Sequence, residues 1–178
     1  MISNRTLAII GCSFLAVMLF RQEARMDRLE DRLDDIIQVN DKIKYTKNDL
    51  DCLTKNIYYE AGTENAQGKI AVAHVTLNRL KTGYWGSTIC NVVYARAQFS
   101  WTLQRKLPPP DNQLWTQSEK IALGVLQEGY RVRGLTKSLF YHAIYIRDPN
   151  WVDKQHEAGQ IGNHIFYNQA KGSTLALI

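Results

Sequence analysis

The pattern of apolar residues changes twice along this chain of 178 residues, and these changes limit what it can fold into. An uncharged apolar run comes first, a charged stretch with regularly spaced apolar residues follows, and mixed sequence fills the rest. A chain of this length can form one ordinary globular domain with some sequence left over. We therefore expect a membrane segment at residues 1–21, an amphipathic helical stalk at 22–47 and a globular domain at 48–178.

The apolar run at residues 6–20 carries no charge and lies between Arg5 and Arg21. As a helix it covers about 22 Å, less than the roughly 30 Å hydrocarbon core of a membrane. No pattern of small residues for cleavage follows Phe20, so we expect an uncleaved signal-anchor. Four arginines after the run, against one before it, favour a domain on the cytoplasmic side.

The stalk shows a short heptad pattern. Its core positions alternate in steps of three and four, at Met26, Leu29, Leu33, Ile36, Asn40 and Ile43. Fewer than three heptads are compatible with a parallel coiled coil that joins two chains and also with a single amphipathic helix. A homodimer through the stalk is therefore one of two expectations.

The basic charge of the chain lies in its C-terminal part. Residues 52–178 hold 14 lysines and arginines against 8 acids, whereas residues 21–51 hold 7 against 9. A basic domain attracts polyanions, among them nucleic acid, anionic lipid and peptidoglycan. Because the basic residues are scattered, with no basic helix and no zinc-finger spacing, we do not expect a nucleic-acid partner.

A first helix is predicted at the start of the globular domain, where the apolar positions form one stripe at Leu50, Leu53, Ile57 and Ala61. Asn48 or Asp49 can cap its start, and Gly62 can end it. Glu60 projects from the core-facing side of the last turn, where desolvation raises the pKa of a carboxyl group. A raised pKa suits a general acid. Position alone also fits a salt-bridged residue at a helix end.

A second helix is predicted over residues 65–81, with an apolar face wide enough to be buried on two sides. Glu64 precedes it in the connecting loop. This carboxylate can cap the second helix, where the helix dipole favours negative charge, or it can contact a substrate. The first of these roles is slightly favoured.

Five blocks of residues follow one another between positions 50 and 167. They are Cys52-Leu53-x-x-Asn56-Ile57-Tyr58-Tyr59-Glu60-Ala61-x-x-Glu64, Gly68-x-Ile70-Ala71-Val72-Ala73-x-Val75-x-Leu77-Asn78-Arg79, Thr88-Ile89-Cys90-x-Val92-Val93-Tyr94, Gln98-Phe99-Ser100-Trp101, and a last set with Tyr141-His142-Ala143, Pro149-x-Trp151 and Ile161-Gly162-x-His164-x-Phe166-Tyr167. Together they resemble the SleB/CwlJ family of cell wall hydrolases. Gly62-Thr63 and Lys69 depart from the family's usual residues.

The resemblance implies an α+β, lysozyme-like and mostly helical domain with a small antiparallel sheet, which acts on peptidoglycan through one glutamate that matches Glu60. Aromatic and branched residues predict strands at 138–146 and 161–167. Sugars bind to aromatic rings, amides and hydroxyls. The expected substrate contacts are Tyr59, Glu64, Asn78, Gln98, Phe99, Ser100, Tyr141, His142 and His164. A structural role stays open for Phe99 and for both histidines.

The chemistry expected is that of a single acid, because no motif pairs two carboxylates as most glycosidases require. Glu60 would protonate the oxygen between N-acetylmuramic acid and N-acetylglucosamine. It would then assist closure of a 1,6-anhydro ring, as in a lytic transglycosylase, or attack by water, as in a muramidase. We favour the first outcome and expect no cofactor and no metal.

Two other classes compete with this interpretation. A zinc-dependent N-acetylmuramoyl-L-alanine amidase would need a metal motif, and His156-Glu157 lacks a second histidine three residues later. A non-catalytic wall-binding module would not need Glu60 at all.

The substrate would place the domain outside the inner membrane, against the count of arginines. We expect a single-pass inner-membrane protein with a periplasmic domain that can be released, as in phage endolysins with a signal-anchor, and a role in host cell lysis. In an oxidising periplasm Cys52 and Cys90 are expected to form a disulfide, although two buried thiols are the alternative. Cys12 in the membrane segment is left over, and it could exchange with that bridge.

Overall fold

The structure is a computed structural model that describes residues 16–26, 28–29 and 43–169. These residues form two separate units, one in Met1–Asn40 and one in Asp41–Ile178. In the first unit the described residues are helical. The second unit holds the remaining helices and all described strands.

The predicted membrane span is not supported. Among the described residues no helix is both long enough and apolar enough to cross a membrane. Residues 6–15 and most of the stalk, like Cys12, lie outside the described residues. Pairing of two chains through the stalk, and the boundaries after residues 21 and 47, therefore stay predictions.

The helix that bears Glu60 is α2, Lys47–Ala61. Its N-cap is Thr46 rather than Asn48 or Asp49. The Thr46 hydroxyl accepts a hydrogen bond from the Asp49 amide, and the Asp49 carboxylate accepts one from the Thr46 amide. This reciprocal capping box fixes where the helix begins, and Gly62 ends it as predicted.

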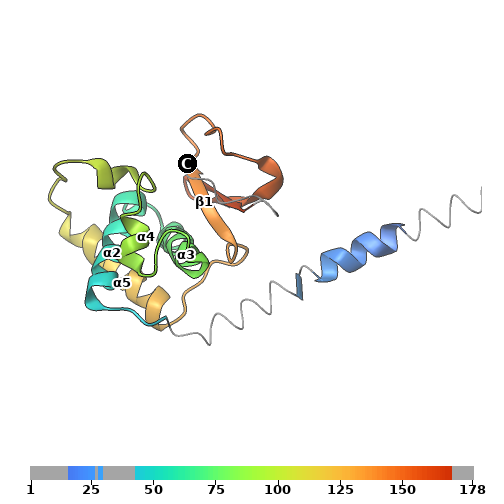
Figure 1. Cartoon of the computed structure of the whole chain (residues 1–178), viewed down its shortest axis with the longest axis horizontal. Coiled ribbons are helices and arrows are strands. Elements are labelled where there is room, and N and C mark those ends of the chain that lie inside the picture. Colours follow the sequence, from blue (N-terminus) through green and yellow to red (C-terminus); the bar gives the residue numbers. More distant parts are fainter. Residues whose placement is uncertain (1–15, 27, 30–42, 170–178) are drawn as a thin grey trace, which may run out of the picture. The chain divides into compact units, whose positions relative to one another are not determined.

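Helix α3, Ala66–Thr82, lies between the other helices and β1 (Figure 1). Its N-cap is Asn65, whose side chain accepts a hydrogen bond from the Gly68 amide, so the predicted cap at Glu64 is wrong. Ala73 and Leu77 belong to one core cluster, while Ala71 and Val75 belong to another. The prediction that this helix is buried on two sides is confirmed.

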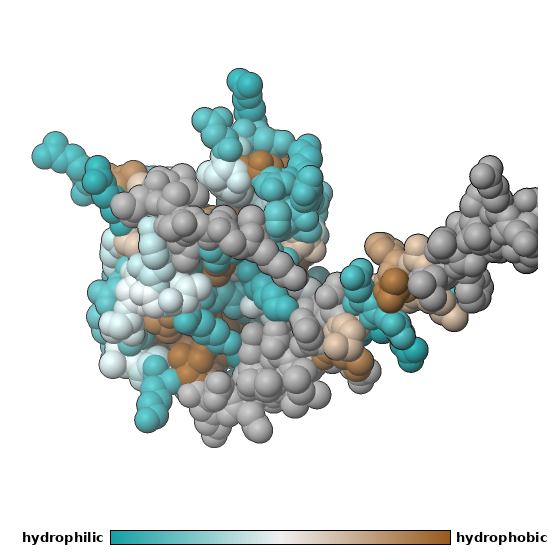
Figure 2. All heavy atoms as spheres, turned by 45° about the vertical axis from the view of Figure 1, so that its right-hand side comes forward, coloured by the Kyte–Doolittle hydropathy of each residue, from teal (hydrophilic) through white to brown (hydrophobic). Residues whose placement is uncertain are grey.

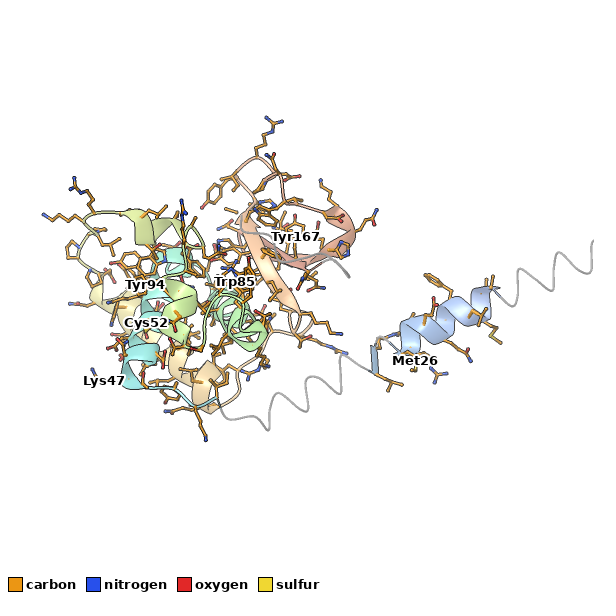
Figure 3. The ribbon with its side chains drawn as sticks, in the orientation of Figure 1. Met26, Lys47, Cys52, Trp85, Tyr94 and Tyr167 are labelled. Carbon is orange, nitrogen blue, oxygen red and sulfur yellow. A yellow bond between two sulfur atoms is a disulfide. The ribbon has the colours of Figure 1, made fainter. Side chains whose placement is uncertain are left out.

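Three further helices complete the helical layer: α4 (Ile89–Val93), the short η1 (Ser100–Leu103) and α5 (Asn112–Gln127). The larger core cluster fills the space between them and α2, with Leu53, Ile57, Phe99 and Trp101 among its members. Cys52 of α2 and Cys90 of α4 form the predicted disulfide, which is confirmed (Figure 3).

A three-stranded antiparallel sheet covers the other side of α3. Its strands are β1 (Ser138–Ala143), β2 (Glu157–Ile161) and β3 (His164–Asn168), with η2 (Lys154–His156) before β2. The strand order is β1-β3-β2, so the last strand lies in the centre. Helices with a small antiparallel sheet confirm the predicted α+β class.

Two strand boundaries differ from the predicted ones. The strand expected over 138–146 ends at Ala143, and the segment expected over 161–167 contains the end of β2, a turn and β3. Gly162 in that turn has a φ of 57°, a left-handed conformation that favours glycine. On the face seen in Figure 2 the described surface is mainly hydrophilic, with apolar side chains exposed in small patches.

Candidate active site

Glu60 lies in the last turn of α2, half-buried, and faces the sheet. The Tyr141 hydroxyl on β1 donates a hydrogen bond of 2.9 Å to Glu60 Oε2. These two residues are 81 positions apart in sequence, so the contact exists only because the sheet packs beside the helices. Tyr141, predicted as a sugar contact, is a direct hydrogen-bond partner of the predicted acid.

The environment of Glu60 raises the pKa of its carboxyl group. Burial is the largest cause, because it disfavours the charged form. The hydrogen bond from Tyr141 and the positive charge of Arg79 act in the opposite direction and favour the carboxylate. Glu60 therefore holds its proton more strongly than a carboxyl group exposed to water. The Tyr141 hydroxyl and the Arg79 charge nevertheless stabilise the carboxylate that remains once the proton has left.

Arg79 of α3 is the residue that sequence reasoning missed. Its Nε donates a hydrogen bond of 2.8 Å to the Leu139 carbonyl, and its guanidinium lies 5.1 Å from the Trp85 ring centre and 5.2 Å from that of Phe99. Figure 3 shows Trp85 beside α3. Burial lowers the pKa of Arg79 to about 10. Within the described residues its Nη1 is buried without a hydrogen-bond partner.

Glu64 does not point into open space as a free ligand would. Its carboxylate accepts hydrogen bonds from the Asn163 side chain at 2.8 Å and from the Asn163 amide at 3.3 Å. Gly68 and Gly162 both approach it so closely that a Cβ at either position would collide with its side chain. Glu64 thus joins the start of α3 to the β2–β3 turn and positions the sheet beside Glu60. Asn163 was not foreseen.

The two predicted histidines lie on opposite faces of the sheet. His164 shares the face of Tyr141, with their ring centres 5.1 Å apart. Burial lowers the pKa of His164, against the charge of Glu64, and its Nδ1 has no hydrogen-bond partner among the described residues. His164 therefore contacts the same tyrosine that donates a hydrogen bond to Glu60.

His142 points away from Glu60, since successive residues of a strand face opposite sides. Its Nδ1 lies 3.0 Å from the Ala143 carbonyl, and its Nε2 lies 3.1 Å from the Tyr167 hydroxyl. Tyr167 is a residue of the central strand β3 (Figure 3). With Trp151 and Asp148 also close, His142 belongs to a structural cluster.

The remaining predicted contacts divide into two groups. Tyr59 stacks on Trp101 with ring centres 4.9 Å apart, next to Glu60, and Ser100 is exposed at the start of η1. Gln98 is half-buried and donates to the Arg96 carbonyl. Phe99, in contrast, is a core residue.

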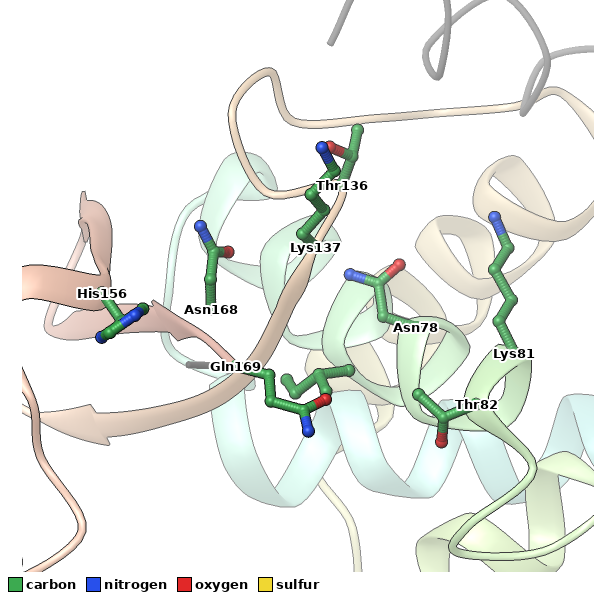
Figure 4. Close-up of a pocket in the computed structure, with 9 residues that line it drawn as sticks. Asn78, Lys81, Thr82, Thr136, Lys137, His156, Asn168 and Gln169 are labelled. Carbon is green, nitrogen blue, oxygen red and sulfur yellow. The ribbon is translucent and has the colours of Figure 1, made fainter. Parts of the chain in front are cut away.

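Asn78 has a structural role that the sequence did not indicate. Its amide donates hydrogen bonds to the carbonyls of Leu135 and Ser138, at 2.8 and 3.0 Å, and so anchors the start of β1. It also lines a cavity of about 550 Å³ at the end of α3, with Lys81, Lys137, His156 and Asn168 around it (Figure 4). Glu60 does not line this cavity.

The histidines are the side chains most suited to metal ligation in this domain. Among the described residues no group of three histidine, cysteine or acidic side chains is arranged to hold an ion. His156, the histidine considered for a zinc motif, pairs with Asp153 at 3.0 Å.

Solved structures with the same fold come from two Bacillus species. The catalytic domain of the Bacillus cereus SleB protein is 24% identical, with a TM-score of 0.59 over 70% of this chain and 93% of that domain. The catalytic domain of the germination-specific lytic transglycosylase SleB from Bacillus anthracis is 23% identical, with a TM-score of 0.56 over 70% of this chain and 97% of that domain. At these identities the likeness shows the fold.

Curated relatives carry the name spore cortex-lytic enzyme. The protein of Oceanobacillus iheyensis is 29% identical over 125 residues, which are 68% of this chain and 42% of the relative. That of Bacillus subtilis is 25% identical over 140 residues, 76% of this chain and again 42% of the relative. The matched part thus spans less than half the length of these relatives.

These findings contradict the predicted location. A single-pass inner-membrane protein is not supported, because the relatives are named as enzymes of the spore cortex and no helix among residues 16–26, 28–29 and 43–169 could span a membrane. The endolysin role stays a prediction from sequence.

The family itself is shown by its model. Residues 63–167 match the model of the cell wall hydrolases, which is more than half of the chain. Glu60 lies three residues before this match, whereas Arg79, Tyr141 and His164 lie inside it. The resemblance to the SleB/CwlJ proteins is confirmed, and the chain belongs to the cell wall hydrolase family.

Proposed function

We propose that this chain cleaves the glycan strands of peptidoglycan between N-acetylmuramic acid and N-acetylglucosamine, with Glu60 as the catalytic acid. The observation that carries the proposal is the hydrogen bond from Tyr141 to a half-buried carboxyl group whose pKa is raised. Family membership and the names of the relatives support peptidoglycan as the substrate.

In the first step the protonated Glu60 gives its proton to the glycosidic oxygen. The bond from that oxygen to C1 of muramic acid breaks, and the leaving sugar departs with a hydroxyl. Glu60 becomes a carboxylate, which the Tyr141 hydroxyl and the charge of Arg79 stabilise. Stabilising the charge that develops during the reaction lowers the barrier.

In the second step the Glu60 carboxylate acts as a base. It takes a proton from the 6-hydroxyl of the same muramic acid, whose oxygen bonds to C1 and closes a 1,6-anhydro ring. Most hydrolytic glycosidases need a second carboxylate, about 5 to 9.5 Å from the first. Glu64, the acid nearest to Glu60 in the sequence, is bound by the amide and the side chain of Asn163, so we do not assign it the role of this second carboxylate. This favours the transglycosylase outcome over hydrolysis.

Substrate contacts are proposed for the exposed or orphaned groups near Glu60. The Tyr59 ring stacks on Trp101 and offers a face for a sugar. Ser100, the residue before Trp101 in η1, is exposed. His164 has an imidazole nitrogen without a partner among the described residues. Gln98 has an amide that is only partly engaged. For Phe99, Asn78, His142 and Glu64 we propose structural roles.

Mass spectrometry of digested sacculi tests the function. We expect glycan fragments with anhydromuramic ends, and none from Glu60→Gln, which keeps the shape and the acceptor oxygen for Tyr141. Reducing muramic ends would replace the transglycosylase by a muramidase. Free stem peptides would show an amidase instead, and an unchanged effect of Glu60→Gln on the wall would show a binding module.

A further inference from the structure

Three consecutive apolar side chains are exposed directly after β1. Ile144 is 45% exposed, Tyr145 79% and Ile146 47%. Their branched and aromatic content predicts a strand, in which alternate side chains would be buried. The strand ends at Ala143 instead, and all three side chains face water. We call residues 144–146 the apolar turn.

The apolar turn is held in place by the backbone. The Ile144 amide donates a hydrogen bond of 2.9 Å to the Asn163 carbonyl, and the Ile146 amide donates one of 3.2 Å to the Ala143 carbonyl. Two residues further on, the Asp148 carboxylate pairs with Lys154 at 3.5 Å. The exposed side chains are thus carried by a segment whose backbone is fixed by hydrogen bonds. Exposed apolar groups on a fixed segment commonly mark a binding surface.

The apolar turn is connected to the surroundings of Glu60 in two ways, through the chain from Tyr141 and through the hydrogen bond to Asn163. Tyr145 follows Tyr141 by four residues, so their Cα atoms are at most about 14 Å apart. Asn163, which accepts the bond from Ile144, also donates to Glu64, four residues after Glu60. Tyr145 therefore lies within about 14 Å, between Cα atoms, of the tyrosine that contacts Glu60, a distance that a bound polymer can span.

The chemistry of the turn suits a sugar. A tyrosine ring offers an apolar face to sugar C–H groups and a hydroxyl at its edge, and it loses little conformational freedom on binding. Isoleucine side chains provide contact area for the methyl groups of N-acetyl substituents. Arg147 follows directly in the sequence. Its charge suits the carboxylates of a peptidoglycan strand.

We propose that the apolar turn binds a sugar unit of the glycan strand beyond the bond that is cleaved, with Tyr145 as the stacking residue. This inference rests on the proposed function, since it extends the same substrate along the surface. It makes Tyr145 a determinant of affinity for long strands rather than a catalytic residue.

The test measures sedimentation with purified sacculi in a Glu60→Gln background, in which the substrate is not consumed. Tyr145→Ala should weaken binding about tenfold, which corresponds to roughly 1.4 kcal/mol. Tyr145→Trp should keep binding within about twofold, because its ring still stacks. Tyr130→Ala is the matched control, an exposed tyrosine after α5 at 41%, and it should leave binding unchanged.

Activity separates this inference from the proposed function. With Glu60 intact, Tyr145→Ala should raise KM on long strands and leave kcat on short fragments unchanged. The inference would be overturned if Tyr145→Ala bound sacculi as tightly as the protein without this substitution and had the KM of the wild type. Loss of binding to anionic lipid vesicles in that variant while sacculus binding stays normal would also overturn it. A third outcome separates the two hypotheses. If the wild-type chain releases no cleaved glycan but Tyr145→Ala still loses sacculus binding, the proposed reaction is wrong while the proposed binding surface is supported.

Discussion

At the scale of single residues, opposed effects act on the pKa of the Glu60 carboxyl group. Burial favours the neutral acid, whereas the Tyr141 hydroxyl and the Arg79 charge favour the carboxylate. A residue that must first donate a proton and later accept one benefits from both. Each partner can be removed separately, so the balance can be measured.

Replacement of Tyr141 by phenylalanine removes only the hydroxyl. A hydrogen bond to a charged group contributes about 1.5–3 kcal/mol, so kcat should fall roughly ten- to hundredfold. The pKa of Glu60 should rise further, because its carboxylate loses a donor. Since activity requires the protonated acid, the alkaline limb of the rate profile should move to higher pH. A limb that stays in place or moves to lower pH would contradict this role of Tyr141.

Glu60→Gln should also change how stability depends on pH. Because the pKa of Glu60 is raised on folding, the folded chain binds this proton more tightly than the unfolded chain. Its contribution to stability is therefore present at low pH and lost as pH rises through the folded pKa. The melting temperature of the variant should exceed that of the wild type by more at pH 8 than at pH 5. Glu119→Gln on α5 serves as the control, and an equal difference at both pH values would refute the burial argument.

The sequence predicted the place of Glu60 on its helix but not its partners. The three-residue step from Ile57 was sufficient to put the carboxyl group toward the core. Tyr141 was expected as a sugar contact. Its hydrogen bond to Glu60 depends on how the sheet packs on the helices, which no local pattern contains. Arg79 stood in a recognised block, and a charge on an otherwise apolar face was the available signal. For His142 the pattern could not tell which face of the strand the helices would cover.

At the scale of elements, the β2–β3 turn is the joint between sheet and helices. Asn163 in this turn donates to Glu64, and Gly162 lies against the same carboxylate. The sequence analysis predicted one strand over 161–167 and missed β2 before it, although Gly162-Asn163 is a dipeptide typical of hairpin turns. The branched and aromatic residues after Ala143 led to a first predicted strand that was too long.

Gly162→Ala should destabilise the domain through two effects. Its left-handed φ of 57° costs a side chain about 1–2 kcal/mol. The new Cβ would also collide with the Glu64 carboxylate and break its bonds to Asn163. Gly129→Ala is a matched control, with a φ of 72° and open space around it. In urea unfolding Gly162→Ala should be the less stable variant and should lose activity. Equal midpoints would show that the joint with Glu64 contributes nothing.

At the scale of the whole molecule, the disulfide links α2 to α4 across a sequence separation of 38 residues. Closing a loop of this length restricts the unfolded chain, so its loss should cost about 3–4 kcal/mol by the loop-entropy model. Urea unfolding of the wild type with and without dithiothreitol measures this. A variant with Cys52→Ser and Cys90→Ser should already have the lower stability and should not respond to the reductant. Equal stability of oxidised and reduced wild type would contradict the prediction.

The strand order has a consequence for how late the candidate site forms during synthesis. Because β3 lies between β1 and β2, the sheet cannot assemble until residues 164–168 have left the ribosome. Until then β1 has no partner strand, and Tyr141 has no fixed place from which to donate its hydrogen bond to Glu60. The Glu60 carboxyl group therefore gains the surroundings that raise its pKa only in the last stage of folding of this domain.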